Sequence, residues 1–168
     1  GELITEHTDF PPGVINIVTS SDHRIGALLS EDPRVDMVSF TGSTATGRAV
    51  MTAAAATIKK VFLELGGKSA FVVLDDADLA GACSMAAFTA SMHAGQGCAI
   101  TTRLLVPRQR YDEAVEATAA TMASLRPGDP NDARTVCGPL ISARQRDRVQ
   151  GYLDLAIQEG GRFACGGG

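Results

Sequence analysis

The sequence predicts an α/β fold, in which helices alternate with the strands of a parallel sheet. Short runs rich in valine, isoleucine and leucine are separated by longer stretches in which apolar residues recur every three or four positions. Successive runs follow at the short intervals that are typical of strand–helix–strand units. Apolar residues make up 45% of the chain and charged residues 20%, a composition that can supply a buried core.

The first part of the chain is predicted to hold three strands, at residues 14–18, 37–40 and 60–65. A short helix at 24–29 separates the first two strands. It ends before Asp32-Pro33, because proline disfavours helical backbone in the residue that precedes it. A second helix, from about 46 to 56, connects the second strand to the third. This order predicts parallel pairing with covering helices.

The alternation resumes after Gly66-Gly67, a glycine pair that marks either a hairpin or a crossing between two domains. The elements expected here are a strand at 70–74, a helix from the acidic cap at 75–78 to about 93, a strand at 103–106, a helix at 111–125, a loop at 126–139, a helix at 142–159 and a strand at 162–165. The acidic cap suits a helix N-terminus, since carboxylates accept hydrogen bonds from the free backbone N–H groups there.

Charge and cysteine content exclude several classes of protein. The formal net charge is −4, so no surplus of lysine and arginine favours nucleic acid. No apolar run reaches the roughly 18 residues that a membrane span needs. The four cysteines form no CxxC pair and no zinc-type spacing with the three histidines, so we expect no metal site. At this cysteine density we expect reduced thiols and a cytoplasmic protein.

Both ends of the 168-residue chain look cut. The start, at Gly1 and Glu2, has neither an initiator methionine nor the basic region of a signal peptide, and the chain closes on three glycines. We therefore expect the sequence to be a segment of a longer protein.

Residues 42–47, which read Gly-Ser-Thr-Ala-Thr-Gly, lie between a predicted strand and a predicted helix. A helix N-terminus offers free backbone N–H groups and the positive end of the helix dipole, which suit a phosphate group. The segment is not a P-loop, because Arg48-Ala49 follow it where a P-loop has lysine and a hydroxyl residue. The alternative interpretation is an ordinary helix cap.

Cys98 follows glycine-rich backbone and precedes small residues. Small neighbours would leave its thiol reachable and let backbone N–H groups approach an oxyanion. The alternative is an inert buried cysteine, which is our interpretation of Cys83. His93 lies five positions before Cys98, and on a helix that spacing would place the two side chains on different faces. We therefore do not expect a Cys–His hydrolase pair.

Glu64 is a charged residue in an otherwise apolar strand, just before Gly66-Gly67. α/β proteins place their chemistry at the carboxyl ends of strands. Partial burial there would make this carboxylate a better general base. The alternative is a solvent-facing residue at a strand end, and Lys68 is either its partner charge or simple surface.

Taken together, three segments closely resemble the aldehyde dehydrogenase superfamily. They are Phe-Thr-Gly-Ser-Thr at 40–44 with Gly47-Arg48, Leu-Glu-Leu-Gly-Gly-Lys-Ser at 63–69, and Gly-Gln-Gly-Cys at 95–98. Their order matches, and so does the interval from Glu64 to Cys98. The resemblance covers essentially the whole chain. The chain departs from the family at Gly97, where many relatives carry a larger residue, and at 20–23, where relatives usually place glycines near the cofactor phosphates.

The resemblance implies a role for each candidate residue. Cys98 would be the nucleophile that adds to the aldehyde, with its backbone N–H in the oxyanion hole. Glu64 would be the base that activates water to hydrolyse the thioester. Gly42 and Ser43 would bind the pyrophosphate of NAD or NADP, and the backbone of Leu65 would approach the nicotinamide side.

The resemblance also implies a domain organisation. Residues 1–66 would be the C-terminal part of a Rossmann-like NAD(P)-binding domain, and residues 67–168 the N-terminal part of the catalytic, thiol-bearing domain. The complete enzyme would be roughly three times as long as this chain, act on a small-molecule aldehyde, and form a homodimer or homotetramer.

Two alternatives stay open. One is a relative that transfers the acyl group to coenzyme A, although such relatives commonly lack a carboxylate at the position of Glu64. The other is an inactive structural fragment. We expect the 168-residue segment to be inactive on its own.

Overall fold

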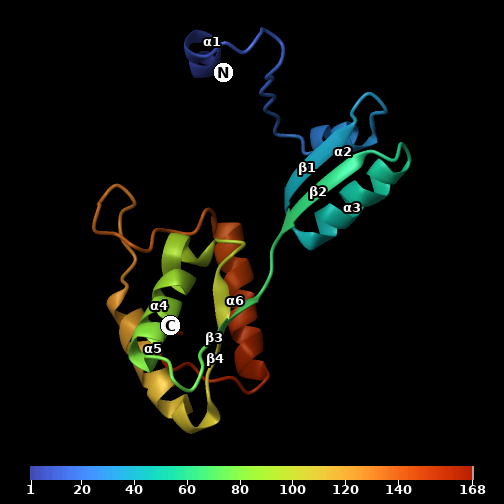
Figure 1. Cartoon of the computed structure of the whole chain (residues 1–168). Coiled ribbons are helices and arrows are strands. Elements are labelled where there is room, and N and C mark those ends of the chain that lie inside the picture. Colours follow the sequence, from blue (N-terminus) through green and yellow to red (C-terminus); the bar gives the residue numbers. More distant parts are fainter. Residues whose placement is uncertain (168) are drawn as a thin grey trace. The chain divides into compact units, whose positions relative to one another are not determined.

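The computed structural model describes residues 1–167 and divides into two compact units, the first ending at Leu65 and the second beginning at Gly66. Each unit combines helices with a pair of parallel strands (Figure 1), which confirms the α/β prediction. In the part of the chain that the structure describes, no helix has both the length and the apolar character needed to cross a bilayer.

The first unit is built around a strand–helix–strand motif. Its elements in chain order are α1 (Glu2–His7), α2 (Arg24–Glu31), β1 (Met37–Gly42), α3 (Thr44–Ala55) and β2 (Lys60–Leu65). Strands β1 and β2 pair in parallel, and α3, which connects them, packs on both strands. The sequence therefore placed these strands, the helix between them and their parallel pairing correctly.

Helix α3 approaches the sheet closely because it carries a glycine where it meets β2. A Cβ atom on Gly47 would lie 2.8 Å from Leu65 Cδ2, so a larger residue would push the helix away. Val50 and Ala54 are buried on the same face of the helix, one and two turns further along. This face holds the N-terminus of α3 beside the end of β2.

The second unit has the same alternation. Its elements are β3 (Ser69–Val72), α4 (Leu79–Ser91), η1 (Met92–Gly95), β4 (Thr101–Leu105), η2 (Arg108–Arg110), α5 (Tyr111–Ser124) and α6 (Ala143–Gln158). Strand β3 pairs in parallel with β4. Helices α4 and α5 pack against each other over one face of this pair, around a core of Val73, Leu79, Cys83 and Ala114.

Two helices of this unit begin at capping side chains, where the sequence predicted the helices to start. The side chain of Asp78 accepts a hydrogen bond from the backbone N–H of Gly81 at 3.3 Å and caps α4. Ser142 caps α6 in the same way. Cys83 is completely buried, which confirms its assignment to the core.

Three sequence predictions need correction. Residues 14–18 and 162–165 are not strands. Within residues 1–167 neither segment joins a strand ladder, and a β-branched pattern alone does not satisfy backbone hydrogen bonds. The predicted start of α3 was two residues late, because Ser43 caps the helix. Of the two interpretations left open for Gly66-Gly67, the hairpin is excluded, since β2 and β3 belong to different sheets.

Candidate functional site

The turn after β1 presents a helix N-terminus in the first unit. Ser43 is the N-cap of α3, and its Oγ accepts a hydrogen bond from the backbone N–H of Thr46 at 3.2 Å. The first N–H groups of a helix have no partner within the helix and carry its positive dipole end. Gly42 and Ser43 are exposed, so an anionic group can reach this end of the helix.

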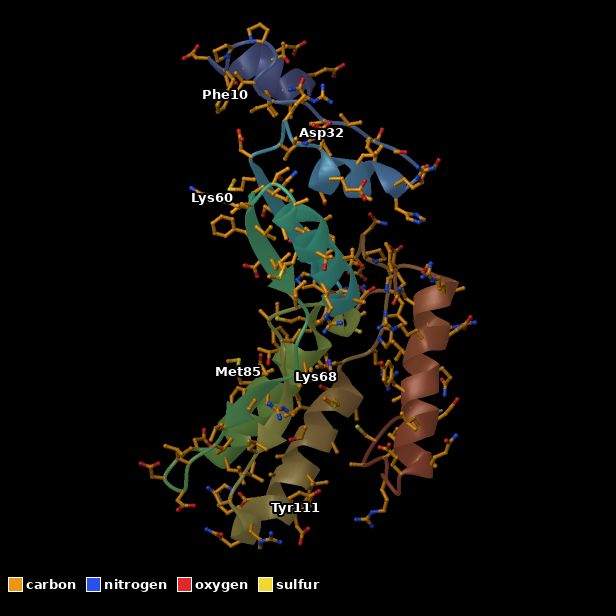
Figure 2. The ribbon with its side chains drawn as sticks, turned by 90° about the vertical axis from the view of Figure 1, so that its right-hand side faces the viewer. Phe10, Asp32, Lys60, Lys68, Met85 and Tyr111 are labelled. Atoms are coloured by element: carbon orange, nitrogen blue, oxygen red, sulfur yellow. The ribbon has the colours of Figure 1, made fainter. Side chains whose placement is uncertain are left out.

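The strand register brings the first-unit candidates to one edge of the sheet. Gly42 lies opposite Leu65, and Thr41 lies opposite Glu64. Because β1 and β2 are parallel, both carboxyl ends meet where α3 begins. The structure therefore places Gly42, Ser43, Glu64 and Leu65 together, as expected for a site at the carboxyl edge of a parallel pair. Figure 2 labels Lys60, which begins β2 at the opposite end of the strand.

The side chains at this edge differ in burial. Leu65 is half-buried and its methyl groups lie against Gly47. Glu64, the preceding residue of the strand, is exposed. Of the two positions that the sequence allowed for Glu64, the structure has the solvent-facing strand end and not the partly buried one. Its carboxylate is therefore open to solvent.

A hollow of about 690 Å³ lies between α2 and α3. It is lined by Glu31, Ala45, Arg48, Ala49, Thr52, Ala53 and Ala56. The wall formed by α3 is made largely of alanines, so a flat group could lie against the helix. This face was not among the sites predicted from the sequence. Alanines at 45, 49, 53 and 56, which are three or four positions apart, would have indicated it.

In the second unit, the chain turns sharply before Cys98. Helix α4 ends at Ser91, and His93 and Ala94 then adopt left-handed backbone with φ of 51° and 55°. Gly95 continues the turn with φ of 73°. Residues with a Cβ atom rarely adopt this conformation. The turn thus separates the nucleophile segment from the helix that precedes it.

Cys98 is exposed, as the small neighbours predicted. It lines a hollow of about 450 Å³ together with Thr89, Met92, His93, Gly97, Ala99, Ile100 and Thr101. The prediction that His93 lies on a different helical face from Cys98 is wrong, because α4 ends before His93. A Cβ atom on Gly97 would lie 2.8 Å from Ile100 Cγ1, so the glycine leaves room for that side chain beside the thiol.

Each unit contributes different candidates: Gly42, Ser43, Glu64 and Leu65 belong to the first unit and Cys98 to the second. Within residues 1–167 there is no cluster of three or more side chains that could hold a metal ion. Cys83, Cys98, Cys137 and Cys165 are all free thiols.

Comparison with known proteins identifies relatives over almost the whole chain. A family model described as the aldehyde dehydrogenase family matches residues 2–168. The chain is 43% identical over 164 residues to the 3-succinoylsemialdehyde-pyridine dehydrogenase of a Pseudomonas species, a match that covers 98% of this chain and 34% of that protein. The chain thus spans about a third of the length of the curated relatives it matches.

Solved structures agree. A mutant of aldehyde dehydrogenase C from Pseudomonas syringae, in complex with NAD+ and octanal, matches with a TM-score of 0.90 and 40% identity, over 94% of this chain and 32% of that one. Betaine aldehyde dehydrogenase from Staphylococcus aureus, in complex with NAD+, matches with a TM-score of 0.93 and 37% identity. This match covers 99% of the present chain and 33% of that one.

Proposed function

The chain belongs to the aldehyde dehydrogenase family, and we propose that the enzyme containing it oxidises an aldehyde to a carboxylic acid with NAD+ or NADP+. The observation that carries the proposal is the exposed thiol of Cys98 in a hollow beside small residues. Relatives that match nearly the whole chain were solved with NAD+. One of them also holds octanal.

The first unit fits a dinucleotide. The N-terminus of α3, with Gly42 and Ser43, would hold the pyrophosphate through backbone N–H groups. The alanine-lined hollow along α3 offers a flat apolar wall to a ring system. The backbone of Leu65, opposite Gly42, would border the nicotinamide side. When bound, the nicotinamide accepts the hydride that leaves the substrate carbon.

In the first half of the reaction, the thiolate of Cys98 adds to the aldehyde carbon and forms a thiohemiacetal. The backbone N–H of Cys98 would donate a hydrogen bond to the developing oxyanion. Loss of hydride from the same carbon leaves a thioester on Cys98. The small neighbours Gly97 and Ala99 leave the sulfur accessible to the substrate.

In the second half of the reaction, Glu64 would take a proton from water as that water attacks the thioester. The carbon–sulfur bond then breaks, so that the carboxylic acid is released and the thiolate of Cys98 is restored. Glu64 is exposed at the end of β2, so a water molecule can reach its carboxylate. Retention of this carboxylate favours hydrolysis over transfer to coenzyme A.

Further assignments belong to the same proposal. Residues 1–66 form part of the cofactor-binding domain, and residues 67–168 form part of the catalytic domain. Because the two halves of the reaction draw on both, residues 1–168 on their own are expected to be inactive. The four free thiols favour a cytoplasmic location. We place the complete enzyme among homodimers or homotetramers.

The test is Cys98→Ala in the complete enzyme. Removal of the nucleophile should lower aldehyde oxidation to below about 1% of the wild-type rate while binding of NAD+ stays intact. Cys165→Ala, which removes a half-buried thiol outside the proposed site, is the matched control and should keep its activity. Turnover by Cys98→Ala above that level would overturn the assignment.

A further inference from the structure

We infer that Gln96 is a positioning residue that holds the turn bearing Cys98 in its reactive geometry, an inference that rests on the proposed role of Cys98. Gln96 lies two residues before the nucleophile. Its Nε2 donates a hydrogen bond to the carbonyl of His93 at 2.9 Å. Its Oε1 accepts one from the backbone N–H of Ile141 at 3.0 Å, across 45 positions of sequence. One carboxamide thus joins two segments that are distant in the chain.

The turn needs such support because its backbone is unfavourable. His93 and Ala94 both have Cβ atoms and both adopt left-handed backbone. The carbonyl of His93 accepts two hydrogen bonds from Gln96, one from the side chain and one from the backbone N–H at 3.1 Å. These bonds close the turn on itself. Cys98 follows Gln96 after only one residue, Gly97, so its position depends on the closed conformation.

The segment at the other end of the carboxamide is itself anchored. Ile141 precedes Ser142, the N-cap of α6, whose Oγ accepts a hydrogen bond from the backbone N–H of Gln145 at 3.3 Å. Upstream, the carbonyl of Cys137 accepts one from the backbone N–H of Gly128 at 3.0 Å. Across residues 1–167, the side chain of Gln96 makes the hydrogen bonds between this segment and the turn.

The chemistry of the partners calls for an amide. Gln96 faces an N–H group at Ile141 and carbonyls at His93 and Pro139, the second at 3.5 Å from Nε2. Glutamine offers an acceptor to the first and a donor to the others. Leucine has a similar size and offers neither. Glutamate keeps the acceptor but turns a second oxygen toward the two carbonyls.

The experiment measures the burst of NADH formation in the complete enzyme by stopped flow, with aldehyde and NAD+ saturating. Gln96→Leu and Gln96→Glu should each slow the burst by about 10- to 100-fold, since a misplacement of about 1 Å costs that much. The KM for NAD+ should stay within about twofold of wild type, because neither substitution removes a contact that the proposed function assigns to the cofactor.

Thiol alkylation by iodoacetamide separates positioning from folding. Cys98 is exposed and should react at a similar rate in both variants, because a small reagent does not need the reactive geometry. Cys83 is fully buried and should stay unmodified while the fold is intact. Gln109→Leu is the matched control: that carboxamide donates to Asp75 Oδ1 at 3.3 Å, away from the turn, and its loss should leave the burst unchanged.

A wild-type burst rate in Gln96→Leu or Gln96→Glu overturns the inference. Alkylation of Cys83 in both variants also overturns it, because Gln96 would then only support the fold. A slowed burst in Gln109→Leu overturns the inference as well, because the effect would then not be specific to the carboxamide of Gln96. None of these results touches the assignment of Cys98, which fails only if Cys98→Ala remains active.

Discussion

At the scale of single residues, backbone conformation determines how Cys98 is presented. A helix continued through His93 would carry the following residues along its own axis. The left-handed residues His93, Ala94 and Gly95 instead redirect the chain, and the thiol is exposed beside a hollow. Strained backbone of this kind persists where surrounding contacts over-determine it, and it concentrates at functional sites. The hydrogen bonds of Gln96 are such contacts.

The role of Glu64 predicts a separation of the two half-reactions. In Glu64→Gln the side chain keeps its shape but cannot take a proton from water, so acylation should proceed while hydrolysis slows by about 10²-fold or more. Stopped-flow measurement should therefore show a burst of NADH close to one equivalent per active site, followed by slow turnover.

Glu116→Gln provides the control, because Glu116 is an exposed carboxylate on α5 and is expected to tolerate the change. Equal loss of burst and steady-state rate in Glu64→Gln would instead assign Glu64 a structural role.

At the scale of elements, the turn that follows α3 holds a β-branched residue in a backbone conformation that such residues rarely adopt. Ile58 follows the helix with φ of 53° and is 92% exposed. The turn is otherwise well bonded: Lys59 donates its backbone N–H to Ala54 and its Nζ to the carbonyl of Asp32, at 2.7 Å. A left-handed residue after a helix is usually glycine or asparagine, because a Cβ atom is unfavourable there. The β-branched Ile58 makes this turn a point of strain.

Replacing Ile58 with glycine should therefore stabilise the enzyme. Relief of the left-handed strain should outweigh the added chain entropy and raise the free energy of unfolding by about 1 kcal/mol. Urea titration of the complete enzyme measures the change. Ala55→Gly, three residues earlier at the end of the helix, is the opposite control and should lower stability by roughly 1 kcal/mol. Destabilisation by both changes would show that the strain at Ile58 is already relieved.

At the scale of the whole chain, the sheet of the second unit has one covered face and one open face. Val73 is 5% exposed and lies in the core under α4 and α5. Its neighbours Val72 and Leu74 are 61% and 66% exposed, and Leu105 on β4 is 51% exposed. Parallel sheets are ordinarily covered on both faces. The open face therefore exposes apolar side chains that favour association.

Residues 1–168 produced on their own should accordingly self-associate and show no NAD-dependent oxidation of aldehydes. Two-stranded sheets are marginally stable, which adds to this tendency. Size-exclusion chromatography with light scattering measures the association, and the double variant Val72→Thr, Leu105→Thr should reduce it. A monodisperse monomer with one cooperative melting transition would contradict the prediction.

The sequence alone predicted the elements whose signals are local. The cap at Asp78 acts within three residues, and the apolar spacing of α5 lies within that helix, so neighbouring residues along the chain largely specify these elements. The nucleophile and base candidates could be predicted too, because Cys98 and Glu64 stand in short motifs. Signals of this range need no knowledge of distant neighbours.

The tertiary structure decided what depends on distant parts of the chain. Strand register placed Gly42 opposite Leu65. Residues 14–18 are irregular because no strand within residues 1–167 pairs with them, and the turn after Ser91 brought His93 and Cys98 to one hollow. The bond from Gln96 to Ile141 spans 45 positions, beyond any local pattern. The physical reason is that burial, ladder pairing and long-range hydrogen bonds depend on which segments meet in space, whereas capping and periodicity depend on neighbours along the chain.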